Sequence, residues 1–164
     1  MVIGELPVRE SRIEDVEVIA NDIRPMDKLE NEVMHSIEDA DMRIPLFGGY
    51  ISSKPCYSFV DEEDNAIAMF GVTPTDENNG AGGIWLLGSN KTSEPKYVRT
   101  FIKGCKPFVD KVCEDYTYVF NFVHKDNRLH QRWLKWLGFN LTPMDGEEEP
   151  FCHFIKLEKY ITHV

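Results

Sequence analysis

The sequence predicts an α/β (α+β) domain in which helices flank a central mixed, mostly antiparallel sheet. Apolar runs typical of strands and amphipathic segments typical of helices follow one another in the order β-α-α-β-β-β-α-β-α-β-β. Strand-helix-strand units favour right-handed crossovers and some parallel pairing, whereas consecutive strands favour antiparallel hairpins. The length of 164 residues suits a single domain, residues 1–164, with a sizeable core.

The N-terminal third is predicted to form one short strand, residues 6–11, and two helices. Two capping-box patterns mark the helix starts, Ser11 with Glu14 and Asp27 with Glu30. Pro25 ends the first helix, and the apolar periodicity of the second continues to Ala40. This part of the chain is therefore expected to contribute the β-α-α portion of the fold.

Three strands are predicted next. Residues 55–61 and 65–73 flank an acidic turn, which indicates a hairpin. Residues 73–83 form the clearest loop of the chain. The strand after that loop, residues 83–88, is mostly apolar, as is typical of a strand buried on both faces.

A long amphipathic helix and a further strand are predicted between residues 93 and 124. Pro95 suits the first turn of the helix, whereas Pro107 predicts a kink or an early break. The strand covers residues 117–124. Together with the strand at residues 83–88, this helix makes a crossover unit of the sheet.

The stretch HKDNRLHQRWLKWLGF, residues 124–139, is predicted to form the last helix. Asp126 or Asn127 can cap its N-terminus, and Gly138 is expected to be the left-handed residue after its end. The apolar face is given by Leu129, Trp133, Trp136 and Leu137. This pattern favours a core helix with a solvated basic face over a nucleic-acid-binding helix. Residues 139–143 and 151–159 form the last two strands.

Charge and composition exclude several classes of function. Eighteen Lys and Arg against 28 Asp and Glu give a net charge of −10, which argues against direct nucleic-acid or membrane binding. The sequence has no secretory signal pattern and no run near the roughly 18 apolar residues of a spanning helix. Its cysteines lack metal-site spacing, so free thiols and no metal are expected: Cys56, Cys105, Cys113 and Cys152.

The chain resembles the GCN5-related N-acetyltransferase (GNAT) fold. The order of elements carries this resemblance, together with Asn127, the helix after it and Gly138-Phe139. Four stretches are similar to a bacteriophage family of GNAT-like proteins: AIAMFGVTP, IWLLGS, FNFVHKDNRLHQRWLKWLGF and EEPFCHFIK. That family includes the small internal virion protein of teseptimavirus-type podophages and phage proteins labelled as acetyltransferases. It implies a protein of the host-cell cytoplasm or of the virion interior.

The resemblance implies a site for acetyl-CoA, the acyl donor of GNAT enzymes. In that fold the fourth and fifth strands splay apart around pantetheine, and the pyrophosphate sits on amides at the next helix start. The residues implied here are Trp85, Leu86, Leu87, Gly88, Ser89, Asn90, Lys91, Ser93 and Asn127. Two departures from the enzyme pattern are visible. The loop SNKTSEP lacks glycine and contains Glu94, and Leu134 replaces the tyrosine that protonates the thiolate in many members.

The catalytic candidates lie on and beside the fifth strand. His124, at its end, is the candidate base because its ordinary pKa suits proton transfer near pH 7; the alternative is an edge histidine facing solvent. Tyr118 or Tyr116 can replace the missing acid only if the fold brings one into the cleft. His130 is expected on the helix surface, and Trp85 either in the core or along an acceptor cleft.

Three functions remain open from the sequence. The first is an acetyl-CoA-dependent N-acetyltransferase acting on a small amine or a protein. The second is a non-catalytic virion-assembly or internal virion protein that retains the fold and contacts virion proteins. The third is a binding module with a CoA or nucleotide pocket but no turnover. Strand ends splayed at Leu86 and Phe122 would favour the first, and a fully paired sheet the second.

Overall fold

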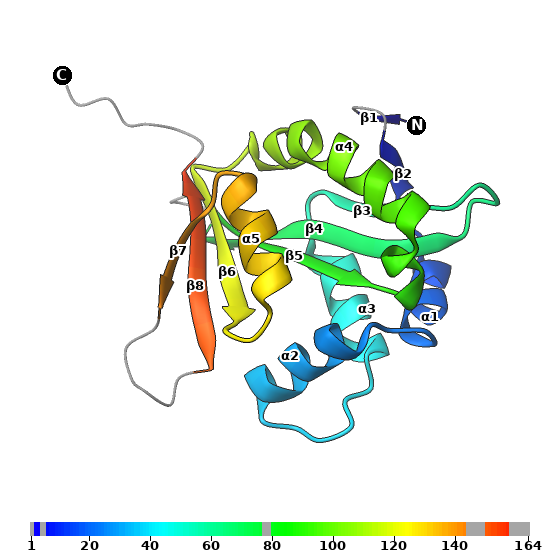
Figure 1. Ribbon diagram of the computed structural model, residues 1–164, viewed down its shortest axis with the longest axis horizontal. Helices are drawn as coiled ribbons and strands as arrows, with labels where there is room; N and C mark the ends of the chain where they lie inside the picture. The colour runs from blue at the N-terminus through cyan, green and yellow to red at the C-terminus, as the bar shows by residue number, and fades with distance from the viewer. Residues whose placement is uncertain (1, 4–5, 77–79, 144–149, 158–164) are drawn as a thin grey trace.

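The computed structural model describes residues 2–3, 6–76, 80–143 and 150–157. In chain order the elements are β1 Val2–Ile3, β2 Leu6–Glu10, α1 Ile13–Ala20, α2 Pro25–His35, α3 Arg43–Ser52, β3 Cys56–Val60, β4 Ala66–Asp76, β5 Ala81–Gly88, a 3₁₀ turn Asn90–Ser93, α4 Pro95–Cys113, β6 Tyr118–His124, α5 Arg128–Trp136, β7 Asn140–Pro143 and β8 Phe151–Leu157. The expected single mixed sheet flanked by helices is confirmed (Figure 1).

The strands form one sheet in the order β1-β2-β3-β4-β5-β6-β8-β7. Every neighbouring pair is antiparallel except β5 and β6, which α4 connects by a parallel crossover. The sheet is therefore mixed and mostly antiparallel, as predicted. The loop expected at residues 73–83 is shorter than predicted, because β4 runs to Asp76 and β5 begins at Ala81.

Helices cover both faces of the sheet, and each face has its own core. The α4 and α5 helices lie on one face, where Phe59, Cys105, Phe108 and Val119 are among the fully buried side chains (Figure 1). The α1 and α3 helices cover the opposite face of β4 and β5, where Ile19 and Leu46 are fully buried. Burial of apolar surface on both faces is the main source of stability in such a layered fold.

β5 contributes to both cores because its side chains alternate between the faces. Ile84 and Leu86 pack toward α4 and α5, whereas Trp85 and Leu87 pack toward α1 and α3. Trp85 also determines how closely α3 approaches β5. A Cβ atom added to Gly49 would lie 2.5 Å from the Trp85 ring, so only glycine allows this approach.

The parallel pairing of β5 and β6 stops halfway along both strands. Their register runs from Ala81 opposite Tyr118 to Gly83 opposite Phe120, and beyond it the strands diverge (Figure 1). Asn121 occupies the branch point. Its Nδ2 donates to the carbonyl of Ile84 at 2.8 Å, and its Oδ1 accepts the amide of Phe122 at 2.9 Å. The side chain thus takes the place of the next ladder hydrogen bond.

The N-terminal helices differ from the prediction. Three are present instead of two, because residues 43–52 form α3 despite Pro45 and two glycines, which disfavour a helix. The first helix ends at Ala20, well before Pro25. Pro25 instead occupies the first turn of α2, which ends at His35, short of Ala40. Tertiary packing of Leu46, which is fully buried, outweighs the weak local propensity of α3.

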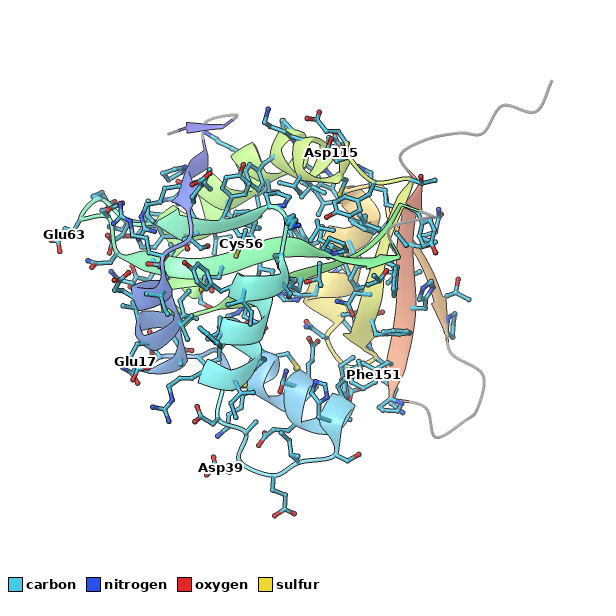
Figure 2. The ribbon with its side chains drawn as sticks, turned by 180° about the vertical axis from the view of Figure 1, so that it is seen from behind. Glu17, Asp39, Cys56, Glu63, Asp115 and Phe151 are labelled. Carbon is cyan, nitrogen blue, oxygen red and sulfur yellow. The ribbon has the colours of Figure 1, made fainter. Side chains whose placement is uncertain are left out.

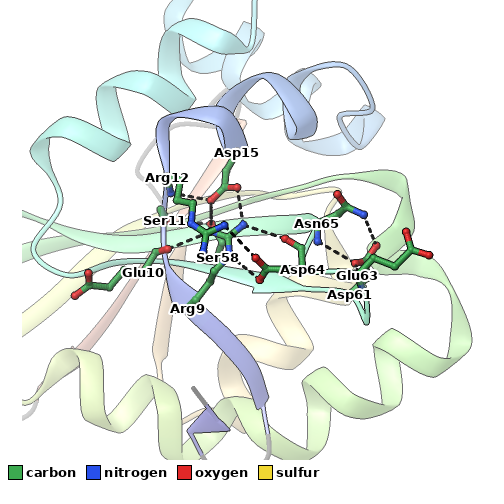
Figure 3. Close-up of polar contacts among 10 residues, drawn as sticks. All are labelled: Arg9, Glu10, Ser11, Arg12, Asp15, Ser58, Asp61, Glu63, Asp64 and Asn65. Atoms are coloured by element: carbon green, nitrogen blue, oxygen red, sulfur yellow. Dashed lines mark hydrogen bonds and ion pairs between the residues drawn. The ribbon is translucent and has the colours of Figure 1, made fainter.

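The capping predicted for α1 is also wrong by one position. The capping carboxylate is Asp15, which accepts the amide of Arg12 at 2.8 Å, while Ser11 Oγ lies 2.9 Å from Ser58 Oγ. Asp15 is nearly fully buried and binds both terminal nitrogens of Arg9 at 2.8 Å (Figure 3). This polar network joins β2, α1 and β3.

The two C-terminal helices have about the predicted extent, but the residues that they bury differ in part from the prediction. The α4 helix continues through Pro107, so the expected break is absent. In α5, Leu134 is buried at 6% exposure, whereas Leu129 and Trp136 are 68% and 47% exposed. Leu137 is buried and Trp133 packs against the core as predicted, so the apolar face is rotated by part of a turn toward Leu134. Gly138 has the expected positive φ, +99°. In the described part of the chain, no helix combines the length and apolarity that crossing a bilayer requires.

Candidate active site

The diverging ends of β5 and β6 border a cavity of about 240 Å³, which we call the cleft. Residues 84–87 of β5 and 121–123 of β6 form two of its walls. The others come from α2, α5 and β8, including Glu30, His130 and Phe151. Seen from behind, Phe151 lies at the end of β8 that faces α2 (Figure 2). The cavity therefore lies where the sheet has lost its pairing.

Glu30, on α2, reaches across this cavity to the start of α5. Its Oε1 accepts a hydrogen bond from Asn127 Nδ2 at 2.7 Å, and the amide of His124 donates to the same oxygen at 3.4 Å. Asn127 is also the N-cap of α5, because its Oδ1 accepts the amide of His130 at 3.3 Å. One buried asparagine thus fixes both the helix start and the carboxylate.

The surroundings of Glu30 favour its protonated form. Burial raises the pKa of Glu30 above its ordinary value, and the negative charge of Asp27 acts in the same direction. The hydrogen bonds from Asn127 and His124 oppose this rise in pKa. A carboxylate with a raised pKa is a stronger base than an exposed one, so Glu30 is suited to accept a proton within the cleft.

Asp27 connects α2, the helix that carries Glu30, to the end of β5. Its side chain is 2% exposed, and its Oδ2 accepts the amide of Gly88 at 2.8 Å. The guanidinium of Arg24 donates to both carboxylate oxygens, at 2.9 and 3.0 Å. This paired interaction holds α2 against β5, which places Glu30 at the point where the strands separate.

A second cavity, of about 290 Å³, lies between the N-terminal halves of α4 and α5. We call it the donor groove, and its lining is Arg24, Phe59, Ala68, Leu86, Thr92, Ser93, Val98, Phe101, Ile102, Leu129, His130 and Trp133. Leu86, His130 and Trp133 line both the groove and the cleft. The two cavities are therefore adjacent, separated by one layer of side chains.

His130 was expected on the helix surface, but it lies half-buried between the two cavities. Burial, aided by the positive charge of Arg24, lowers the pKa of His130 to about 4. The ring is therefore neutral at pH 7. A neutral imidazole can donate or accept one hydrogen bond, but it is a poor source of protons at that pH.

The loop between β5 and α4 is hydrogen-bonded to the rest of the chain. The Ser89 hydroxyl donates to the carbonyl of Ile67 at 2.9 Å, and Asn90 Nδ2 donates to Asp22 Oδ1 at 2.9 Å. Lys91 Nζ pairs with the buried Asp61 at 2.6 Å. Ser93 lines the donor groove. The predicted phosphate-contacting side chains of Ser89, Asn90 and Lys91 thus all have protein partners.

The candidate catalytic residues of the fifth strand lie elsewhere. His124 is buried beside Phe151, and its Nδ1 accepts the amide of Asp126 at 3.1 Å. Its side chain does not line the cleft, although its amide contacts Glu30. Tyr118 lies opposite Ala81, at the paired end of the strands, and packs beside Phe120. The structure therefore does not bring Tyr118 or the His124 ring into the cleft.

Other predicted positions do meet at the cleft. Trp85, Leu86 and Leu87 line it, and Asn127 binds Glu30 at its edge. Trp85 is half-buried and donates from Nε1 to Ser53 Oγ at 2.7 Å, so the core and the cleft-lining interpretations both apply. Tyr116 is buried and donates to the carbonyl of Lys54 at 2.5 Å, away from the cleft. Leu134 faces the cleft with an apolar side chain.

Glu30, Asp27 and Asn121 are residues of this candidate site that the sequence pattern does not predict. Asp27 and Glu30 were interpreted as a helix cap, and Asn121 stood within a strand. A polar residue in the middle of an apolar strand is the one signal that could have marked Asn121. Among the described residues, the structure brings together no group of three His, Cys, Asp or Glu side chains suited to a metal ion.

These features define the GNAT fold: a parallel crossover, strands that separate after it, and an asparagine-capped helix beside the opening. Solved structures share this fold at low sequence identity. The spermidine N-acetyltransferase of Vibrio cholerae, solved in complex with CoA and spermine, has a TM-score of 0.64 at 12% identity. The alignment covers 94% of this chain and 96% of that one. The chain therefore has the acetyltransferase fold.

A GNAT-family acetyltransferase from Bacillus anthracis gives a TM-score of 0.63 at 10% identity, covering 96% of this chain and 99% of that chain. A family model described as "Bacteriophage T7, probable scaffold protein Gp13" matches residues 72–142. No curated protein sequence matches the chain. The sequence-level likeness is thus to a phage family over the segment from β4 to β7, whereas the fold-level likeness extends over nearly the whole chain.

Proposed function

We propose that this protein is a phage-encoded N-acyltransferase that moves an acetyl group from acetyl-CoA to an amine in the β5–β6 cleft. The observation that carries the proposal is the loss of pairing beyond Gly83 and Phe120, with Glu30 at the resulting cavity. Among the described residues, the edge of β5 that faces β6 has no strand partner beyond this point. The Ile84 carbonyl and both backbone groups of Gly88 already have partners. The backbone of Leu86, midway between them, can therefore hydrogen-bond the amides of pantetheine, as a sheet edge binds an extended peptide.

In the proposed reaction, Glu30 takes a proton from the substrate ammonium, directly or through one water. The free amine attacks the thioester carbonyl, so a C–N bond forms and the C–S bond breaks. The electron pair of the broken bond leaves on sulfur. Thiols have an ordinary pKa of about 8.5, and the leaving thiolate is protonated by water. This route needs no tyrosine at position 134, and His130 supplies a neutral polar contact.

The acceptor is expected to be a cationic amine, either small or on a protein. Glu30 places at the cleft a carboxyl group that has no cationic partner in the ranges the structure describes, and the net charge of −10 attracts cations over longer range. The spermine present in the V. cholerae structure is an amine of this kind, bound by a protein of the same fold.

Isothermal titration with acetyl-CoA and desulfo-CoA tests the proposal, followed by an acceptor assay with spermidine and lysine peptides. Binding below millimolar concentration and amine-dependent release of CoA are expected. Glu30→Gln should lower turnover at least about 100-fold while binding of CoA persists, because it removes only the base. Glu38→Gln, at an exposed position outside the cleft, is the matched control. Absence of any CoA binding would refute the enzyme function.

A second function is supported by the loop and by the family match. Three observations favour a non-catalytic role in virion assembly. The polar side chains of residues 89–91 are bonded within the protein, and Leu134 is apolar. The chain is also similar to a phage scaffold family over residues 72–142. Virion proteins would then be its partners. Complementation of a phage lacking this gene separates the two functions. Normal titre with Glu30→Gln, together with the protein in purified particles by mass spectrometry, favours assembly.

A further inference from the structure

We propose that the donor groove recognises a thioester through its pantetheine arm and not through its nucleotide. This inference rests on the proposed acyl-transfer function and concerns the donor side of the same site. Its consequence is that S-acetyl-pantetheine, which lacks the nucleotide, serves as a donor about as well as acetyl-CoA.

The first reason is that the loop after β5 has few amides free to bind a pyrophosphate. The amides of Ser89, Asn90, Thr92 and Glu94 donate to carbonyl oxygens of the chain at 2.9 to 3.1 Å. Two of these bonds close the 3₁₀ turn at Asn90–Ser93, and two anchor the loop to the carbonyls of Ile67 and Asp22. An N–H group makes one strong hydrogen bond, so these four cannot also serve a phosphate.

The second reason is electrostatic. Lys91, the cation of the loop, pairs with the buried carboxylate of Asp61, and Arg24, in the donor groove, pairs with the buried Asp27. Moving either cation to a phosphate would leave a buried carboxylate without its counter-charge, which is costly. Glu94 adds an exposed negative charge at the start of α4. Lys91 and Arg24 are therefore both held by carboxylates of the chain and not by a phosphate.

The third reason is that the groove itself fits an apolar arm. Its walls include Val98 and Ile102 of α4 and Leu129 of α5, and all three are exposed, with Leu129 at 68%. Exposed apolar side chains gathered along one groove mark a ligand site more often than an isolated one does. Burial of these walls against the pantetheine methyl groups, with the free edge of β5, supplies affinity without the phosphates.

Titration and steady-state kinetics with acetyl-CoA and S-acetyl-pantetheine test this inference. We expect their dissociation constants and kcat/KM values to agree within about threefold, and adenosine 3′,5′-bisphosphate not to compete. A bound pyrophosphate would make several charge-assisted hydrogen bonds, each worth about tenfold or more in affinity. Preference for acetyl-CoA by more than about 30-fold would overturn the inference but leave the proposed function intact. Binding of neither thioester would refute the proposed function itself.

A pair of variants tests the groove. Leu129→Asp places a charge on its wall at an exposed position, where it should not disturb folding, and should weaken both thioesters equally, by more than about tenfold. Ile44→Asp is the matched control, because Ile44 is 72% exposed on α3, outside the groove. Unchanged binding of both thioesters to Leu129→Asp would exclude the groove as the donor site. Circular dichroism checks that both variants are folded.

Discussion

Asn127 Nδ2 donates to Glu30 Oε1 over 2.7 Å, joining two residues that are 97 positions apart in the sequence. The bond connects the N-cap of α5 to α2 across the opening between β5 and β6. The asparagine that gives the chain its resemblance to acetyltransferases therefore also positions the carboxylate to which we assign the proton transfer. Asn127 would influence the substrate only through Glu30, so we regard it as a positioning residue.

Glu30→Gln is expected to raise the thermal stability of the protein although it removes the proposed catalytic base. The folded-state pKa of Glu30 is raised, so the folded protein is destabilised once pH rises through that pKa and the buried group ionises. Glutamine keeps an acceptor oxygen for Asn127 without the charge. Differential scanning calorimetry should show a higher Tm for the variant at pH 8. The two proteins should converge near pH 4, where Glu30 is protonated; a lower Tm for the variant at pH 8 would contradict this account.

The pH dependence of turnover should report the same group. In wild-type protein, kcat should rise with pH through a pKa above the ordinary glutamate value, because burial raises it. Asn127→Ala removes a hydrogen bond that lowers this pKa, so the rise should move to higher pH. The variant also loses a helix cap, worth about 1 kcal/mol of unfolding free energy. Asp126→Ala is the control, and an unshifted pH profile for Asn127→Ala would argue against Glu30 as the base.

Asn121→Ala should loosen the branch point between the strands. Its side chain supplies the hydrogen bond that ends the β5–β6 pairing, and a net loss of about 1 kcal/mol in unfolding free energy is expected. The rate of hydrogen exchange should increase most at Phe122, whose amide donates a hydrogen bond to Asn121 Oδ1. Exchange unchanged at Phe122 and faster elsewhere would show that the divergence of the strands does not depend on this residue.

Arg9→Met should destabilise the protein strongly. It leaves the buried carboxylate of Asp15 without its guanidinium, at a cost of about 3 kcal/mol in urea unfolding near neutral pH. Burial alone would raise the pKa of Asp15, but Arg9, the Arg12 amide and Ser58 together lower it. In wild-type protein this stabilisation is present at neutral pH and is lost as pH falls through the lowered pKa. The double variant Arg9→Met/Asp15→Asn should recover part of the loss, and no recovery would exclude the unpaired charge as the cause.

Local patterns sufficed to predict the sheet, the order of its strands along the chain and the long helices, because hydrophobic periodicity and turn residues determine them. They also narrowed the cap of α5 to Asp126 or Asn127, and the structure shows that it is Asn127. They failed for α3, whose Pro45 and glycines disfavour a helix that packing of Leu46 nevertheless stabilises. They failed for Glu30 because its role comes from a contact with Asn127 far along the chain, and no local spacing encodes such a contact.

The same limit explains why the direction of the His124 ring could not be predicted. Its place at the end of β6 was correct, but its ring turns toward Phe151, and only its amide reaches Glu30. On a strand, one residue of difference decides the face, and side-chain direction at a strand end depends on the neighbouring element. The rotated face of α5 has a similar cause, since α4 and the sheet determine which residues of α5 are buried.

Asp27 and Glu30 both belong to Pro25–His35, whereas the donor groove is formed mainly by residues 86–133. The two carboxylates and the donor groove are thus encoded by separate parts of the chain. The phage family match at residues 72–142 includes most of the groove but none of α2. A relative could replace this one helix and change its acceptor while the thioester side stays intact. Exchange of these eleven residues would change one wall of the cleft, and with it the amine that the proposed site accepts.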